Sequence, residues 1–142
     1  MPPFEHLAVP DSLFAEVIAH ARRESPLECC GLLAGRIADG VGVVSMRFPI
    51  TNDAASATEY ETNPRDMFDA FRAMRAAGLE LLAIYHSHPT SAPVPSRHDL
   101  DRNTYGESVV HVIVGFAAEK AEVRAWWLTE GRYRETETIT KP

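Results

Sequence analysis

The spacing of apolar positions along the chain predicts two long helices. Apolar side chains recur every three or four residues over 12–23, which indicates an amphipathic helix with residues 10–12 as its N-terminal cap. A second apolar stripe follows Asn63 and Pro64 and ends before Gly78. An asparagine cap, a proline at the first helical position and a glycine after the last turn are typical of a helix.

The remaining apolar runs alternate with polar residues or are continuous, as in β-strands. The strongest hairpin signal is Asp39-Gly40, a second turn is expected at Glu130-Gly131, and the small polar residues of 51–59 predict a loop. After a proline-rich stretch, Ser96 is expected to open a short helix. The predicted strands cover residues 4–9, 30–37, 41–50, 80–86, 109–116, 121–128 and 133–138.

The order of these elements, β-α-β-β-α-β-α-β-β-β, predicts an α/β fold with a central mixed, mostly antiparallel sheet flanked by helices. The chain has 142 residues, of which 45% are hydrophobic and 24% are charged. This length suits one hydrophobic core, so we expect residues 1–142 to form a single domain. A (β/α)8 barrel needs roughly 250 residues, which excludes the amidohydrolase barrels that also carry paired histidines.

Charge and composition argue against several kinds of partner. The net charge of −6 is unfavourable for nucleic acid, because binding to phosphates depends on a basic patch. No apolar run approaches 18 residues and no signal peptide is recognisable, so we expect neither a membrane segment nor export. The two cysteines, Cys29 and Cys30, are adjacent and cannot form long-range disulfides, which indicates a reducing compartment such as the cytoplasm.

The segment HSHP at residues 86–89 carries the clearest chemical signal, together with Asp99. If this segment ends a strand, the two-residue period puts His86 and His88 on one face and Ser87 on the other. Two imidazoles and a carboxylate are ligands that zinc accepts, and three protein ligands leave a fourth position open to water. The sequence therefore predicts that His86, His88 and Asp99 form a catalytic Zn²⁺ site, which points to a hydrolase.

The spacing HxHP-x6-SxxD, which ends at Asp99, resembles the signature of the JAMM metalloproteases, also called MPN+ or JAB domains. Upstream, residues 26–33 (PLECCGLL) resemble the P-x-E-x-C-G-x-L segment of the same family, although the doublet Cys29-Cys30 is unusual. The two segments occur in the family's order. The resemblance implies one JAMM/MPN+ domain built as a three-layer sandwich, similar to the cytidine-deaminase fold.

By the same resemblance, Glu28 occupies the position of the catalytic glutamate. A carboxylate in a partly dry site suits a general base that takes a proton from water and returns it to the leaving amine. The resemblance also implies that the Ser96 hydroxyl stabilises the oxyanion of the tetrahedral intermediate. A structural explanation stays open for Ser96 and Asp99, because their spacing of three is also that of a helix capping box.

Four other residues are weaker candidates as ligands. His98 adjoins Asp99 but would point about 100° away from it on a helix. His111 lies inside a predicted strand, where a satisfied core or surface histidine is the usual case. A thiolate of Cys29 or Cys30 would bind zinc but would close the site to water, and Cys30 is more simply a buried strand residue.

The resemblance also implies a class of substrate. The chain has no room after Asp99 for a large insertion and looks like the bacterial members, which release cysteine or other adducts from ubiquitin-like sulfur-carrier proteins ending in Gly-Gly. The implied enzyme is a zinc-dependent (iso)peptidase that hydrolyses the amide bond after Gly-Gly, in sulfur transfer or cysteine biosynthesis. Two alternatives stay open, a metal-dependent amidase for a small metabolite and a non-catalytic MPN scaffold. The oligomeric state is also open, with a homodimer as one option.

Overall fold

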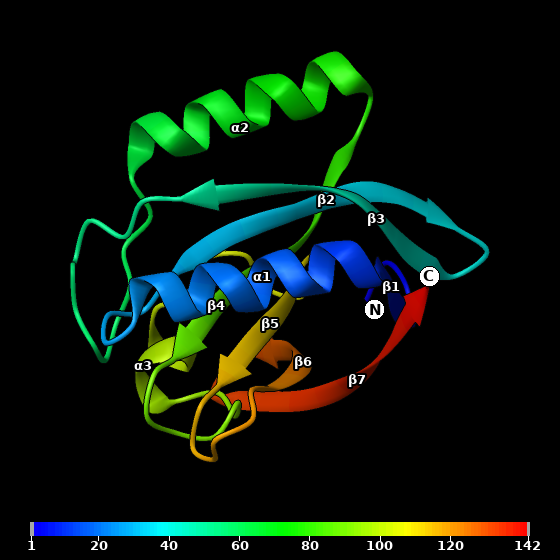
Figure 1. Cartoon of the computed structure of the whole chain (residues 1–142). Helices are drawn as coiled ribbons and strands as arrows, with labels where there is room; N and C mark the ends of the chain where they lie inside the picture. Colours follow the sequence, from blue (N-terminus) through cyan, green and yellow to red (C-terminus); the bar gives the residue numbers. More distant parts are fainter. Residues whose placement is uncertain (1, 142) are drawn as a thin grey trace.

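The structure is a computed structural model, and within residues 2–141 it contains seven strands and three helices in the predicted order (Figure 1). The strands are β1 (His6–Pro10), β2 (Cys30–Ala38), β3 (Val41–Ile50), β4 (Glu80–His88), β5 (Val110–Gly115), β6 (Glu122–Thr129) and β7 (Arg132–Lys141). The helices are α1 (Asp11–Glu24), α2 (Pro64–Ala77) and α3 (Arg97–Asp101).

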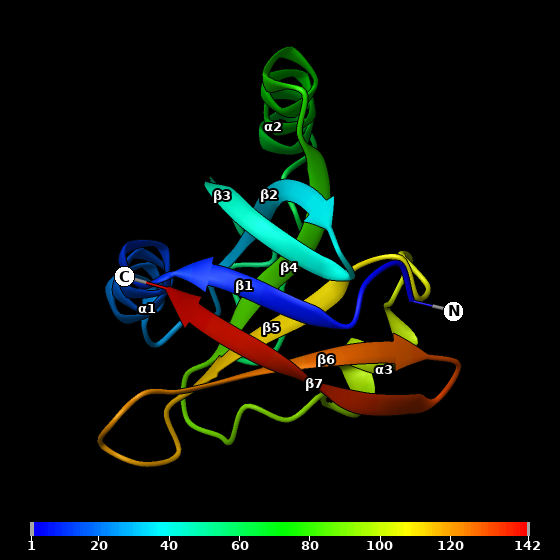
Figure 2. The same cartoon turned by 90° about the vertical axis from the view of Figure 1, so that its right-hand side faces the viewer.

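The seven strands close into a barrel, so the predicted three-layer sandwich of the α/β class is wrong. The strand order is β1-β3-β2-β4-β5-β6-β7, and β1 pairs in parallel with both β3 and β7. Figure 2 shows β1 lying between these two strands. The closing pair places His6 opposite Glu137 and Pro10 opposite Lys141, so the first and last strands of the chain lie side by side and run in the same direction (Figure 2). Because every strand of the barrel has a neighbour on both sides, the described sheet has no free edge.

The three helices lie on different sides of the barrel (Figure 2). Helix α1 contributes Val17 and Ala21 to one buried cluster, which also contains Tyr85 from β4. Helix α2 contributes Ala70 and Met74 to a second cluster on another side of the sheet. None of the helices in residues 2–141 is long and apolar enough to cross a membrane.

The predicted start and end signals of α2 are confirmed. Asn63 is the N-cap, and its side chain accepts a hydrogen bond from the N–H of Asp66, while Pro64 is the first helical residue. Gly78 ends the helix with a φ of 68°, in the left-handed region that favours glycine. Helix α1 instead begins at Asp11, with no hydrogen bond from a capping side chain.

A contact between Gly31 and Tyr85 fixes the packing of β2 against β4. The two residues are opposite each other in the antiparallel pair, and the ring of Tyr85 occupies the space that a Cβ atom at Gly31 would need. The buried Tyr85 hydroxyl accepts a hydrogen bond of 3.0 Å from Arg47 and lies 2.7 Å from Nδ1 of His20. This register places Cys30 opposite His86, so the start of β2 lies beside the candidate site.

Candidate metal centre and active site

Strand β4 positions the two histidines of the HSHP segment. The strand continues through His88, two residues beyond its predicted end, and both histidines are buried. Ser87 points to the opposite face, where its Oγ accepts a 2.8 Å hydrogen bond from the N–H of Cys29. The alternation predicted from the sequence is therefore confirmed, and both imidazoles lie on one face of the strand.

Helix α3 positions Asp99, through a capping box that involves Ser96. The Oγ of Ser96 accepts a 3.1 Å hydrogen bond from the N–H of Asp99, and Oδ2 of Asp99 accepts a 2.9 Å bond from the N–H of Ser96. The structural explanation of this pair is thus correct. It does not compete with a chemical role, because the same Oδ2 atom also faces the two histidines.

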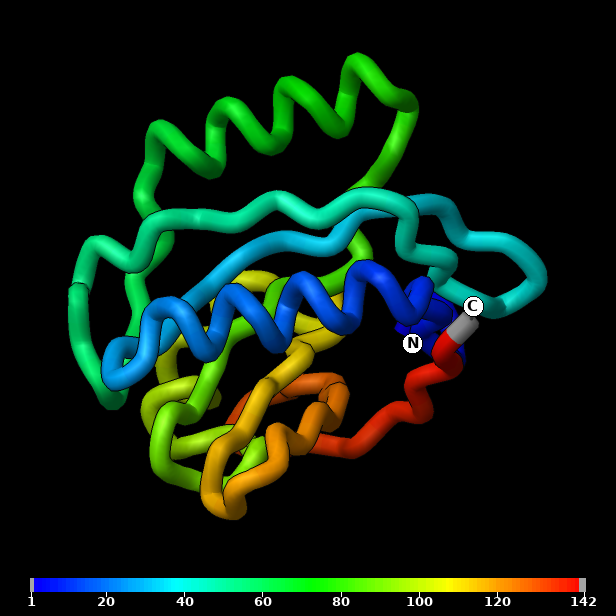
Figure 3. Tube along the Cα trace, viewed as in Figure 1, coloured from blue at the N-terminus to red at the C-terminus, as the bar shows by residue number. Residues whose placement is uncertain are grey.

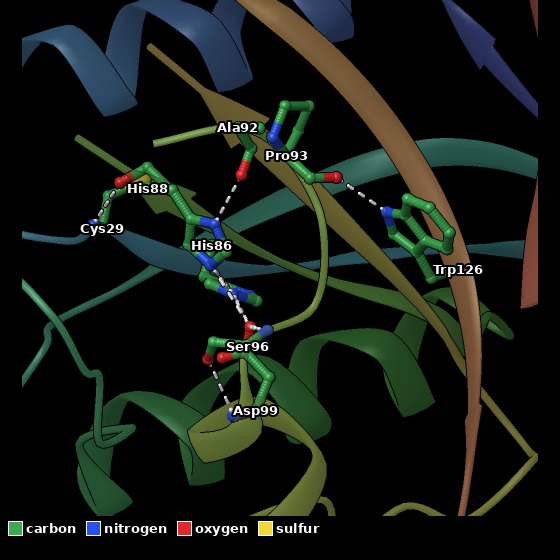
Figure 4. Close-up of polar contacts among 9 residues, drawn as sticks. Cys29, His86, His88, Ala92, Pro93, Ser96, Asp99 and Trp126 are labelled. Atoms are coloured by element: carbon green, nitrogen blue, oxygen red, sulfur yellow. Dashed lines mark hydrogen bonds and ion pairs between the residues drawn. The ribbon is translucent and has the colours of Figure 1, made fainter. Parts of the chain in front are cut away.

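Three donor atoms converge at this point (Figure 4). The Nε2 atoms of His86 and His88 are 3.3 Å apart, and each lies 3.2 Å from Oδ2 of Asp99. A tetrahedral ion with ligands at about 2.0–2.1 Å would separate its ligand atoms by about 3.3–3.4 Å, close to these distances. The donor set of two imidazoles and one carboxylate therefore could hold a metal ion, and its chemistry and spacing fit zinc.

The surroundings of the histidines fix their orientation. Nδ1 of His88 lies 2.9 Å from the carbonyl oxygen of Ala92, so a proton on Nδ1 leaves Nε2 free to bind a metal. The next residue in the loop, Pro93, accepts a 2.8 Å hydrogen bond from the indole of Trp126 (Figure 4). The ring of Tyr60 stacks on His86 with centroids 4.7 Å apart. These contacts leave little freedom for either ring.

Charge interactions in the group favour an ionised aspartate. Burial opposes the charged form of Asp99, but hydrogen bonds from His86 and His88 outweigh it and hold the pKa of Asp99 well below its usual range. Burial also opposes a charge on His88, yet the contacts with Asp99 and the Ala92 carbonyl raise the pKa of His88. A concentrated negative charge at Asp99 is what a cation site requires.

Glu28 lies next to this group, in the segment that precedes β2. Strand β2 begins only at Cys30, and the backbone of Glu28 is bound by the loop over residues 51–62. The N–H of Glu28 donates a 2.8 Å hydrogen bond to the carbonyl of Ser56, and its carbonyl accepts one of 3.0 Å from the amide of Asn52. Figure 3 shows this loop beside the turn that joins α1 to β2.

The carboxyl group of Glu28 is nearly dry. The residue is 4% exposed, and its Oε1 atom has no hydrogen-bond partner in the described part of the chain. Burial raises the pKa of Glu28 to about 8; His88 acts in the opposite direction, while Asp99 and Glu59 add to the rise. A carboxyl group that titrates near neutral pH can both accept and return a proton, which is what a general base in this position requires.

Comparison with known proteins assigns the chain to a family. Residues 10–129 match the model of the family described as prokaryotic homologs of the JAB domain. The chain belongs to this JAB family. Three curated relatives support the assignment with 30% to 39% identity. The probable TtuB-protein conjugate cleaving protease of Thermus thermophilus is 39% identical over 89% of this chain and 78% of that protein.

The other two relatives carry names of the same kind. The CysO-cysteine peptidase of Mycobacterium bovis is 30% identical over 91% of this chain and 87% of its own, and the desampylase of Pyrococcus furiosus is 33% identical over 89% and 84%. A solved structure from Desulfitobacterium hafniense superposes with a TM-score of 0.85 at 29% identity, covering 95% of this chain and 92% of that one. The names of these three relatives describe hydrolases, and the family resemblance drawn from residues 26–33 and 86–99 is confirmed.

The JAB chain also contains residues near the site whose contacts were not predicted. His111 is buried in β5 as expected, but its Nε2 atom has no hydrogen-bond partner among residues 2–141, so it is not a satisfied core histidine. Burial, together with the charge of His86, lowers the pKa of His111 to about 3. His98 lies 3.4 Å from a carboxylate oxygen of Glu59 and is not part of the three-donor group. The cysteines Cys29 and Cys30 are free and buried, and neither belongs to that group.

A cavity of about 200 Å³ opens beside Asp99 in this JAB domain. Residues 60–62 line one part of it, residues 102–105 line another, and Ile84 and His111 contribute from the strands. Residues 102–105 and His111 belong to no recognisable motif in the sequence. Only the fold brings them close to Asp99.

Proposed function

We propose that this protein is a zinc-dependent (iso)peptidase that hydrolyses the amide bond after the C-terminal Gly-Gly of a ubiquitin-like sulfur carrier. The observation that carries the proposal is the convergence of His86, His88 and Asp99 beside the dry carboxyl group of Glu28. The names of the relatives, which include a conjugate-cleaving protease, a cysteine peptidase and a desampylase, support the substrate class. The reaction would serve sulfur transfer or cysteine biosynthesis in the cytoplasm.

His86, His88 and Asp99 would hold the zinc ion. Zinc bound by three protein ligands acts as a Lewis acid and lowers the pKa of a water molecule to about 7. Glu28 would accept a proton from the attacking water and then donate it to the nitrogen of the leaving amine. Its burial supports both steps, because a carboxyl group whose pKa is raised by burial holds a proton more strongly than an exposed one and can pass it on to the amine.

Ser96 would stabilise the oxyanion that forms on the scissile carbonyl. Its Oγ accepts the N–H of Asp99, which leaves the hydroxyl proton free to donate to a substrate oxygen. The capping bond also fixes the position of the oxygen, and a preorganised donor of this kind contributes roughly 2.7–4 kcal/mol to transition-state stabilisation. The capping box therefore supports the role that the family resemblance implies.

The loop over residues 51–62 offers the substrate tail a short free edge, which the closed barrel does not. Asn52 and Thr62 form an isolated antiparallel bridge. Its backbone hydrogen bonds are made by the residues that flank Asn52 and Thr62 in the sequence, and not by Asn52 and Thr62 themselves. In such a pair the N–H and C=O of Thr62 point away from the bridge. Thr62 also lines the cavity beside Asp99, so an extended tail could pair with this edge and reach the metal centre.

Two other functions are compatible with the family, and each differs from the proposed (iso)peptidase in one respect. A metal-dependent amidase for a small metabolite would use the same chemistry but ignore the carrier. A non-catalytic MPN scaffold would not be expected to keep His86, His88, Asp99 and Glu28 together, so the observed group argues against it.

The test compares a carrier–cysteine adduct ending in Gly-Gly with the same adduct ending in Ala-Ala and with a short acyl-cysteine peptide. We expect fast release of cysteine from the Gly-Gly adduct alone, measured by mass spectrometry, because glycines let the backbone approach the metal closely. The E28Q protein, prepared in the same way, controls for contaminating proteases. Equal rates on all three substrates would favour the small-metabolite amidase.

A further inference from the structure

The side chain of Asn52 makes four hydrogen bonds at the start of the 51–62 loop. Its Nδ2 donates to the carbonyl oxygens of Glu28 at 3.0 Å and Glu59 at 3.1 Å. Its Oδ1 accepts from the N–H groups of Ala54 at 3.0 Å and Glu61 at 2.9 Å. Both donor hydrogens and both acceptor positions of the amide are therefore used. The sequence alone shows only a polar loop here.

The backbone of Glu28 is anchored by the 51–62 loop, whereas the next residue, Cys29, is anchored by Ser87 of β4. Glu28 precedes β2, and its two backbone hydrogen bonds go to Asn52 and to Ser56, both in the 51–62 loop. Its own carboxylate offers no second anchor, since Oε1 has no partner among the described residues. The position of this carboxyl group consequently depends on the backbone of Glu28, and both hydrogen bonds of that backbone come from the loop.

Asn52 also holds the residue that covers a metal-binding histidine. Its amide bonds Glu59 on one side of Tyr60 and Glu61 on the other, and Tyr60 stacks on His86 at 4.7 Å with the planes 28° apart. One amide group thus couples the position of the carboxyl group at Glu28 to the position of the ring over His86.

We propose that Asn52 is the positioning residue of the active site, which fixes the backbone of Glu28 and the Tyr60 stack through its amide group. This rests on the proposed role of Glu28 as general base. Asn52 acts on the reaction only through these neighbours. A shift of about 1 Å in a catalytic group can lower turnover by about 10²-fold, so an effect on turnover is expected while metal binding stays intact.

The informative substitution is Asn52→Asp, which keeps the shape of the side chain. The carboxylate still accepts from the N–H groups of Ala54 and Glu61, but it cannot donate and it faces the carbonyl oxygens of Glu28 and Glu59. The contact that positions the base is thereby removed without a cavity.

Asn63→Asp is the matched control. Asn63 lies just after the same loop, donates through Nδ2 to Asp53 at 3.0 Å and accepts from the N–H of Asp66 at 2.9 Å. It has the same chemistry and makes no hydrogen bond to Glu28. General damage to the 51–62 segment should therefore appear in both variants, whereas loss of the Glu28 anchor should appear only in Asn52→Asp.

Two measurements on the zinc-loaded proteins test the proposal. Hydrogen exchange reports the amide of Glu28, which is bonded to Ser56, and does not depend on any substrate. We expect this amide to exchange at least about tenfold faster in Asn52→Asp than in the parent, and no faster in Asn63→Asp. With the Gly-Gly adduct, kcat should fall at least about tenfold in Asn52→Asp while KM and zinc content stay within about twofold.

Equal exchange of the Glu28 amide in all three proteins would overturn the proposal, whatever the rates of hydrolysis. Loss of zinc, or a higher KM with an unchanged kcat, would also overturn it, because Asn52 would then support the loop in general. Failure of the parent protein to hydrolyse the adduct would refute the proposed function instead, and the exchange measurement would still decide the role of Asn52.

Discussion

The indole N–H of Trp126 donates a 2.8 Å hydrogen bond to the carbonyl oxygen of Pro93. This bond joins strand β6 to the loop that runs from the second histidine to helix α3. Both residues are buried, so no water is expected to replace the donor if it is lost. The neighbouring Trp127 is also buried, but its Nε1 has no partner in the part of the chain that the structure describes.

Replacing the two tryptophans separately should therefore have unequal effects. Trp126→Phe leaves the carbonyl of Pro93 unsatisfied, which costs about 1–3 kcal/mol beyond the loss of ring volume. Trp127→Phe removes the same atoms without breaking a hydrogen bond and is the matched control. Urea unfolding of the metal-free proteins measures both. Equal losses of unfolding free energy would mean that the bond to Pro93 contributes little.

Metal binding should depend on His88 and not on His98, which lies outside the three-donor group. We expect the parent to bind about one zinc per chain and His88→Ala to lose most of it, since the variant keeps only two of the three converging donors. His98→Ala removes a histidine that pairs with Glu59 and should bind zinc like the parent. Elemental analysis after dialysis gives the metal content. Equal content in parent and His88→Ala would remove His88 from the site.

Glu28 should be needed for turnover but not for metal binding. Glu28→Gln cannot accept a proton, so we expect kcat to fall at least about 10²-fold while the zinc content and the fold are kept. Glu59→Gln is the control, because it changes a nearby acid in the same way and should cost at most a few-fold. Steady-state kinetics on the Gly-Gly adduct and elemental analysis test this. A loss of zinc in Glu28→Gln would make Glu28 a ligand.

The parts of the molecule that could be predicted are those set by neighbours in sequence. Asn63, Pro64 and Gly78 act within their own helix turns, so the limits of α2 could be read from them. The alternation of residues 86–88 likewise depends only on the strand that carries them. The third donor, Asp99, lies on a different element and does not follow from this alternation; it is predicted from the motif HxHP-x6-SxxD.

The parts that could not be predicted depend on pairing between distant segments. Closure of the barrel requires β1 to pair with β7, at the other end of the chain, and no periodicity within either strand specifies that partner. The anchoring of Glu28 is of the same kind, because Asn52 lies in a segment whose composition indicates only a polar loop. Hydrogen-bonding side chains in such loops have no pattern that distinguishes them from solvent-exposed ones.

His20, a buried histidine on helix α1, should make stability depend on pH. Burial lowers the pKa of His20 below its ordinary value of 6.5; Arg47 and Arg23 act in the same direction and Glu24 opposes them. Below about pH 6.5 the unfolded chain gains a proton on His20 that the folded protein still excludes. Neutral His20 therefore contributes its full share of the unfolding free energy above about pH 6.5. This contribution is lost as the pH falls from about 6.5 towards the lower pKa that His20 has in the folded protein.

The comparison of the parent with His20→Gln isolates this contribution, because the effects of other titrating groups cancel in the difference. At pH 7.5 the variant should be less stable by about 0.5–1.5 kcal/mol, since the contact between His20 and the Tyr85 hydroxyl is lost. At pH 5.5 this deficit should shrink, because the parent then bears the cost of keeping His20 neutral. Urea unfolding with a metal chelator present measures both values. If the stability deficit of His20→Gln is the same at both pH values, His20 has the same pKa in the folded and unfolded states. If the deficit grows at pH 5.5, the pKa of His20 is raised in the folded protein. Either result would contradict the prediction.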